Sequence, residues 1–176
     1  MSTLPSVDLG LMAEHLSTHE GMINKLKVYH INTTNPDLKS IIALQINVMM
    51  SHVRVMLSLI NPDNNEYVEV PDLNMYDVSN QRADGTGINK YNDKWIALEA
   101  HAGAKLMSNE NENYTSALLM KNRNVRNAHV EMALQQLEIQ KRYSDFINRM
   151  GWSFVPNVDA QEQVKTYQHF QHLLNN

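Results

Sequence analysis

The feature that most constrains the fold is the spacing of apolar residues in long, uninterrupted segments. Over 36–60, residues suited to burial recur at alternating steps of three and four, which is the spacing of one face of an α-helix. Asn35 is suited to cap this segment, Pro36 to its first helical position, and the run Asn61–Asn65 to its end. The predicted buried face comprises Leu38, Ile42, Gln45, Met49, His52, Met56 and Leu59.

Four other segments show the same spacing with different regularity. The segment 124–150 is as regular and stops before Gly151, a residue typical of helix C-termini. The segment 8–33 carries Leu9, Met12, Leu16, His19, Ile23, Leu26 and His30 on one face, and Gly21 inside it predicts close packing. The segment 92–120 is weaker, because Asn and Glu alternate over 109–113, which allows a break near Ser108. Asp159 and Glu162 form a capping box for a short last helix.

These elements predict an all-α, ferritin-like four-helix bundle. The 176 residues contain only 6 Gly and 5 Pro, which favours long helices over many turns, and the length suits one domain, 1–176. Short connections near 34 and 122 make two antiparallel hairpins. The region 61–91 is long enough to cross the bundle between them, and 152–176 is a C-terminal extension.

Composition excludes several classes of function. A net charge of −4 without a basic stripe argues against a nucleic-acid partner. The absence of cysteine excludes disulfides, thiolate metal sites and cysteine nucleophiles. Residues 1–12 contain no Lys or Arg, so we expect no signal peptide, and no apolar run predicts a membrane span. We therefore expect synthesis in the cytoplasm.

A metal site is the chemistry that such a bundle suggests first. Ferritin-like dimetal sites use a Glu from two helices and Glu-x-x-His from the other two, yet no Glu here has a His three residues later. A mixed site from His19, His52, Glu99 and Glu131 stays open, and His15 lies one turn from His19. The alternative is that His19, His30 and His52 are neutral core residues bonded to partners such as Gln45 or Asn47.

No other motif predicts catalysis or a cofactor. The run Asp84-Gly85-Thr86-Gly87 lacks the context of a phosphate-binding loop and is interpreted as a turn. No Gly-x-Ser-x-Gly elbow occurs. The eleven methionines lie mostly at helical spacing, as residues that fill gaps in a core do. We therefore assign no catalytic residue, no cofactor and no metal.

Short motifs resemble the Coat F family. The run Ile147-Asn148-Arg149-Met150-Gly151-Trp152, with Pro156 after it, looks like the end of that family's domain. The starts Asn35-Pro36-Asp37-Leu38-Lys39 and Asn124-Val125-Arg126 resemble its Asn-Pro-x-Leu-Arg helix start. The chain departs from the pattern at Ser153, where Tyr is usual, and at Arg123, where Pro would stand.

The resemblance implies a non-catalytic structural protein of the spore coat in Bacillus-type endospore formers, made in the mother cell. Its partners would be other coat proteins and a second copy of itself, since a homodimer is the commonest assembly. Two alternatives remain. One is a metal-binding ferritin-like protein, an oxidase or a stress protein with a degenerate site. The other is a partner-binding bundle outside any coat, which docks through its C-terminal segment.

Overall fold

The computed structural model describes residues 3–76, 92–109 and 114–174. Over these ranges the chain is all-α, 79% helical and without strands. The helices are α1 (Ser6–Asn32), α2 (Pro36–Ile60), α3 (Asp93–Asn109), α4 (Tyr114–Leu119), α5 (Arg123–Arg149) and α6 (Ala160–Phe170), with short 3-10 turns η1 (Leu73–Tyr76) and η2 (Gln171–Leu174).

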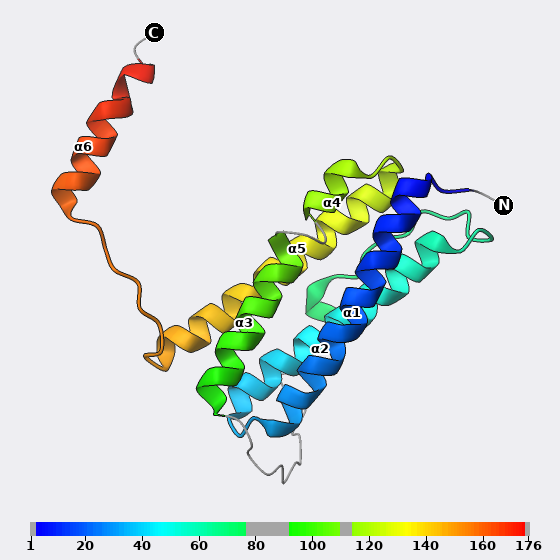
Figure 1. The fold of residues 1–176 in the computed structure, drawn as a ribbon, viewed down its shortest axis with the longest axis horizontal. Coiled ribbons are helices and arrows are strands. Elements are labelled where there is room, and N and C mark those ends of the chain that lie inside the picture. The colour runs from blue at the N-terminus through cyan, green and yellow to red at the C-terminus, as the bar shows by residue number, and fades with distance from the viewer. Residues whose placement is uncertain (1–2, 77–91, 110–113, 175–176) are drawn as a thin grey trace.

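The long helices pack as a bundle (Figure 1). α1 and α2 form one hairpin, α3 packs along α5, and α2 contacts α5 across the bundle. The short α4 lies against α5 beyond the end of α3. Buried aliphatic, methionine and aromatic side chains of these helices fill the space between them in two clusters.

The sequence predicted the helix boundaries well where local signals are strong. The predicted 36–60 coincides with α2, and 8–33 and 124–150 each differ from α1 and α5 by one or two residues. The Asn35 and Asn122 side chains each accept two backbone N–H groups at the start of α2 and α5. The predicted 92–120 is instead two helices, α3 and α4, in agreement with the break allowed near Ser108. Asn side chains favour such breaks because they compete for backbone hydrogen bonds.

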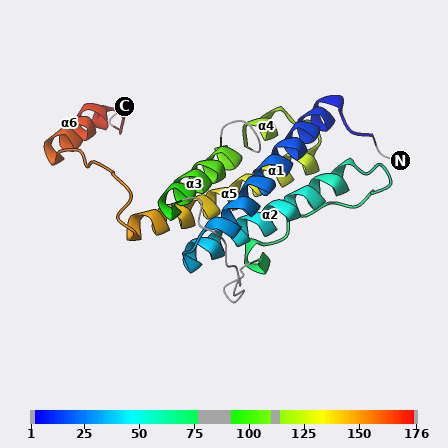
Figure 2. The ribbon, with the colours of Figure 1, turned by 60° about the horizontal axis from the view of Figure 1, so that its bottom comes forward.

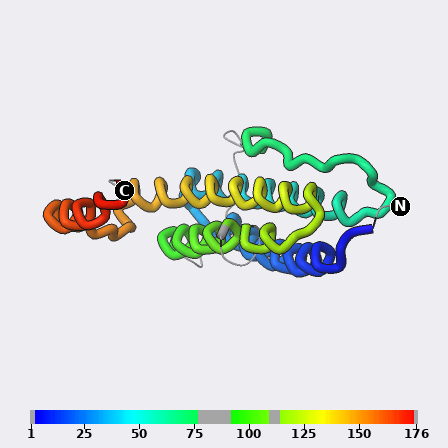
Figure 3. Tube along the Cα trace, turned by 90° about the horizontal axis from the view of Figure 1, so that it is seen from above, coloured from blue at the N-terminus to red at the C-terminus, as the bar shows by residue number. Residues whose placement is uncertain are grey.

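The connection after α2 runs back along the outside of the bundle (Figure 3). The Asn124 side chain bonds both backbone groups of Val68, and Gln135 Nε2 donates to the carbonyl of Pro71. The Tyr76 hydroxyl donates to Ser51. The described part of the predicted crossover, 61–76, is therefore attached to α2 and α5. The rest of it, with the predicted turn Asp84–Gly87, lies outside the described residues.

The chain leaves the bundle after α5. Gly151 has φ 68°, and the N–H groups of Gly151 and Trp152 donate to the carbonyls of Asn148 and Ile147, which is a Schellman motif. The Trp152 ring returns to the bundle and lies edge-on to Phe146, with ring centres 5.8 Å apart. Every residue from 153 to 174 is exposed, and α6 stands apart from the other helices (Figure 2).

Two expectations differ from the structure. Gly21 is exposed and open space surrounds it, so the prediction of close packing there was wrong; Gly103 of α3 is the glycine that a neighbour, Met22, closely approaches. The second expectation is that no apolar segment suits a membrane span. α2 is long and apolar enough to cross a membrane, although half of its most apolar window is buried in the bundle, as in a core helix.

Candidate functional site

Four histidines meet inside the bundle. His15 and His19 come from successive turns of α1, His52 from α2 and His129 from α5, and each side chain is buried. The ring centres of His15 and His129 are 5.1 Å apart, and those of His19 and His52 are 5.8 Å apart. We call these four residues the histidine cluster.

Hydrogen bonds to backbone carbonyls determine the tautomer of two of the rings. His19 Nδ1 lies 2.8 Å from the carbonyl oxygen of His15, and His129 Nδ1 lies 2.8 Å from that of Val125. A carbonyl oxygen only accepts, so each Nδ1 carries the proton and donates it. In the neutral rings, the Nε2 atoms of His19 and His129 therefore present lone pairs.

The tautomer of His52 follows from an amide. Gln135 Nε2 donates to the carbonyl of Pro71 over 2.7 Å, so its Oε1 is the atom that faces His52 Nε2 at 2.9 Å. His52 Nε2 must then donate, and His52 Nδ1 presents the lone pair. His15 Nε2 lies 3.1 Å from the Ser116 hydroxyl, which can donate or accept, so this contact leaves both tautomers of His15 open.

The remaining ring nitrogens of the cluster lack partners. His15 Nδ1, His19 Nε2, His52 Nδ1 and His129 Nε2 are buried, and no group of the described chain forms a hydrogen bond with them. At least three of these four atoms are acceptors that meet no donor. Buried polar atoms are usually satisfied, so this concentration of unsatisfied atoms marks the cluster as the candidate functional site.

The rings are neutral at pH 7. Burial, with the electrostatic effect of neighbouring histidines, lowers the pKa of His15 to about 3 and that of His52 to about 3. Burial lowers the pKa of His19 to about 4, although its bond to the His15 carbonyl opposes the shift. Burial also lowers the pKa of His129. Neutral imidazoles offer lone pairs, which suits metal coordination better than anion binding.

A second polar group lies further along the core, on the same helices. The Tyr143 hydroxyl donates to Gln45 Oε1 over 2.9 Å, and Gln45 Nε2 donates to Gln136 Oε1 over 3.2 Å. Burial raises the pKa of Tyr143 well above its ordinary value. This chain of side chains joins α2 to α5 and is internally bonded, apart from Gln136 Nε2.

The structure separates the predicted mixed site. It brings His19 and His52 together, but Glu99 forms an ion pair with Lys25 over 3.0 Å and Glu131 is exposed. Nor does Gln45 or Asn47 serve as the partner of a buried histidine: His52 uses Gln135, and His30 is only half-buried. Within the described ranges, no three His, Asp or Glu side chains are placed to hold one ion together.

From the sequence, His129 was weighed together with Glu131, and it was left out of the mixed site because residues two apart on a helix point to different faces. In the structure His129 shares the buried face of α5 with Val125, Ala128 and Met132. His15 was noted only as a neighbour of His19. The signal that could have identified both is helical spacing: each lies three residues from a buried methionine.

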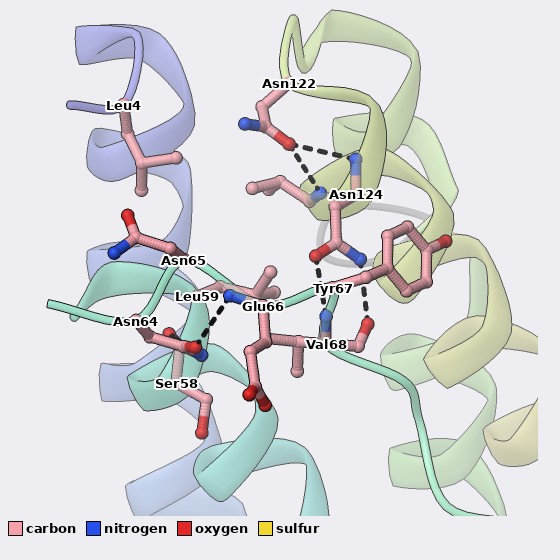
Figure 4. Close-up of a pocket in the computed structure, with 11 residues that line it drawn as sticks. Leu4, Ser58, Leu59, Asn64, Asn65, Glu66, Tyr67, Val68, Asn122 and Asn124 are labelled. Atoms are coloured by element: carbon pink, nitrogen blue, oxygen red, sulfur yellow. Dashed lines mark hydrogen bonds between the residues drawn. The ribbon is translucent and has the colours of Figure 1, made fainter. Parts of the chain in front are cut away.

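Two surface hollows lie outside the histidine cluster. One, of about 340 Å³, lies between the start of α5 and the connection after α2 (Figure 4). Its Asn122 and Asn124 side chains are already bonded to backbone groups around them, so they serve the fold. The other, of about 350 Å³, is a groove over α3, α4 and α5, lined by Lys105, Ser108, Tyr114, Ala133, Leu134, Leu137 and Gln140.

Comparison with known proteins identified no relative. No protein-family model matches the chain, and neither a curated protein nor a solved structure matches it.

Proposed function

We propose that this protein is a structural component of a bacterial spore coat, that it works by association, and that it catalyses no reaction. The resemblance of Ile147–Trp152 and the two helix starts to the Coat F family supports the coat. The bundle of α1, α2, α3 and α5 supports the further proposal that the topology is ferritin-like, with a long crossover between the hairpins.

The observation that carries the association is the exposed apolar surface of the C-terminal segment. Phe154 is 89% exposed, and the other large apolar side chains of 153–174 are also exposed: Val155, Val158, Val164, Tyr167, Phe170, Leu173 and Leu174. Exposed large apolar side chains concentrated in one segment are typical of interaction sites. Since α6 is amphipathic and stands apart from the bundle, a partner is needed to cover it (Figures 1 and 2).

The partner we propose first is a second copy of the chain. The groove over α3, α4 and α5 offers the exposed apolar side chains of Tyr114, Leu134 and Leu137 to such a helix. Each copy carries one C-terminal helix and one groove. If the helix of each copy lies in the groove of the other, both apolar surfaces are covered and the two copies form a closed two-fold dimer. Other coat proteins would then bind the assembled dimer.

The mass of the assembly in solution tests this proposal. We expect the full chain to be a dimer by light scattering, and a chain ending at residue 156 to be a monomer. Leu137→Glu should also be monomeric, because it places a charge in the groove. Leu57→Glu on α2 is the matched control, since Leu57 is 53% and Leu137 52% exposed, and it should remain dimeric. A dimer that survives both the truncation and Leu137→Glu would contradict the proposal.

The coat assignment needs a separate experiment in a spore-forming host. We expect the protein to appear late in sporulation and to fractionate with the coat of mature spores. Expression confined to vegetative cells would contradict it.

A second function, metal binding, is favoured by the unsatisfied nitrogens of the histidine cluster. It is compatible with a structural role, because a bound ion would stabilise the folded chain.

A further inference from the structure

We propose that two imidazoles of the histidine cluster and a thioether, from Met12, Met56 or Met132, bind one soft, singly charged metal ion, Cu⁺. The proposal does not depend on the coat assignment or on the C-terminal segment. It rests on three observations: unsatisfied imidazole nitrogens, buried methionines about one helical turn from the histidines, and a shortage of buried negative charge.

The imidazoles are already oriented as metal ligands are. A metal-bound histidine usually donates its other ring N–H to a carbonyl or amide oxygen, which holds the ring in place. His19 and His129 donate in this way to carbonyls one turn earlier, and His52 donates to Gln135. Metal–nitrogen bonds are about 2.0–2.1 Å, so rings that share an ion have centres roughly 5–6 Å apart. The two ring pairs of the cluster, at 5.1 and 5.8 Å, lie in this range.

The methionines lie next to the histidines on each of the three helices. Met12 precedes His15 by three residues, Met56 follows His52 by four, and Met132 follows His129 by three. At these spacings the paired side chains share one face of a helix. Met12, Met56 and Met132 are fully buried and pack in a single cluster. Thioether and imidazole ligands together favour Cu⁺ among the biological metals.

Charge also favours a singly charged ion. Asp8 is the one fully buried acidic side chain in the described ranges, and both of its oxygens already accept backbone N–H groups of Lys121 and Asn122. A divalent ion with neutral ligands would leave two positive charges in a core that supplies one carboxylate, and burying uncompensated charge is costly. Cu⁺ with neutral ligands adds a single positive charge, and the one buried carboxylate, Asp8, is enough to balance it.

The proposed ligands differ from those of a histidine–carboxylate site. No three His, Asp or Glu side chains of the described chain can hold one ion as placed. Two imidazoles and a thioether form a different kind of site, for which a small number of soft ligands is enough.

The test is anaerobic titration of the full-length protein with Cu⁺, kept reduced by ascorbate, in competition with a coloured Cu⁺ chelator. The protein should carry His169→Gln and His172→Gln, which remove the exposed pair on the last turns. We expect one Cu⁺ per chain, with Zn²⁺ binding at least about tenfold more weakly. X-ray absorption of the loaded protein should show both nitrogen and sulfur ligands.

Matched variants locate the site. His52→Gln and Met56→Leu should each weaken Cu⁺ binding by at least about tenfold. His101→Gln and Met50→Leu are the controls, because His101 is only half-buried and Met50 is exposed on the same helix as Met56; both should change binding less than about twofold. Met→Leu conserves volume, so Met56→Leu tests the site even if His52→Gln fails to fold.

Three results would each overturn the proposal. The first is failure to retain Cu⁺ against the chelator. The second is binding that Met56→Leu and Met132→Leu both leave unchanged. The third is an absorption spectrum with nitrogen or oxygen ligands alone. None of them bears on the dimer, which is measured separately by mass.

Discussion

The residue that carries most of the chemistry in this bundle is histidine, held neutral by burial. His15, His19 and His52 have pKa values of about 3, 4 and 3 in the folded chain, well below the ordinary 6.5. In the unfolded chain the same rings regain ordinary values. Folding is therefore linked to the release of protons as soon as the pH falls below 6.5.

Stability should consequently fall with acid. At about pH 7.5 and above, the rings bind almost no protons in either state, so the stabilisation is complete. As the pH falls from 6.5 toward the folded values, the unfolded chain binds more protons and the free energy of unfolding decreases. Urea denaturation between about pH 7.5 and 5 measures this before most carboxylates titrate. His52→Gln should make the dependence shallower, whereas a flat profile in the wild type would contradict the burial of these rings.

The hydrogen-bonded side chains of Tyr143, Gln45 and Gln136 contribute to stability. Tyr143→Phe removes the donor to Gln45 Oε1 and leaves that buried oxygen without it, so we expect a loss of about 1–2 kcal/mol in the free energy of unfolding. Tyr67→Phe is the matched control, because Tyr67 is largely exposed; its effect should stay within about 0.5 kcal/mol. Chemical denaturation of the two variants measures the difference, and equal effects would contradict the assigned role.

Capping decides where the helices begin and end. Asn35 and Asn122 occupy equivalent positions at the starts of α2 and α5, and each satisfies two N–H groups. The end of α5 depends instead on a backbone conformation. Gly151 adopts positive φ, which an L side chain rarely does, although nothing lies within 4 Å of where a Cβ would be placed.

Two glycine substitutions should therefore have opposite signs. Gly151→Ala should lower the free energy of unfolding by about 1 kcal/mol through backbone strain alone. Gly21→Ala lies inside α1 in open space, and should raise it by roughly 0.5–1 kcal/mol because alanine favours a helix. Thermal unfolding of both proteins checks the signs; a destabilising Gly21→Ala would show that something packs on that turn.

The bundle and the C-terminal segment differ in their exposure to solvent. The residues after Trp152 are all exposed, whereas α1, α2, α3 and α5 share buried cores. We therefore expect the core of the bundle to stabilise the folded chain and the C-terminal segment to mediate association.

Limited proteolysis with a broad-specificity protease distinguishes the two parts. Within the described ranges we expect the first cuts at 153–159, because this stretch is extended and exposed. The remaining bundle should melt at the same temperature as the undigested monomeric variant Leu137→Glu, a comparison from which the stability contributed by the dimer is absent. Cuts within α1 or α5 before this stretch, or a clear fall in melting temperature, would contradict the division.

Much of the fold was predictable from local signals. Helical spacing, the Asn caps and Gly151 act within a few residues of one another, so the bounds of α2 and the stop of α5 could be derived from the printed sequence. The crossover was predictable only as a long connection. That Val68 and Pro71 attach to α5 depends on Asn124 and Gln135, more than 50 residues away.

Local patterns in the sequence are enough to conclude that this chain is helical, where its main helices lie and that a Glu-x-x-His site is absent. That His129 lies beside His15, and that Glu99 and Glu131 lie outside the histidine cluster, follows from how the helices pack. The physical reason is that periodicity gives the buried face of each helix separately. Which turns of two faces meet depends on the stagger and rotation of one helix against another, and these are set by packing of the whole core.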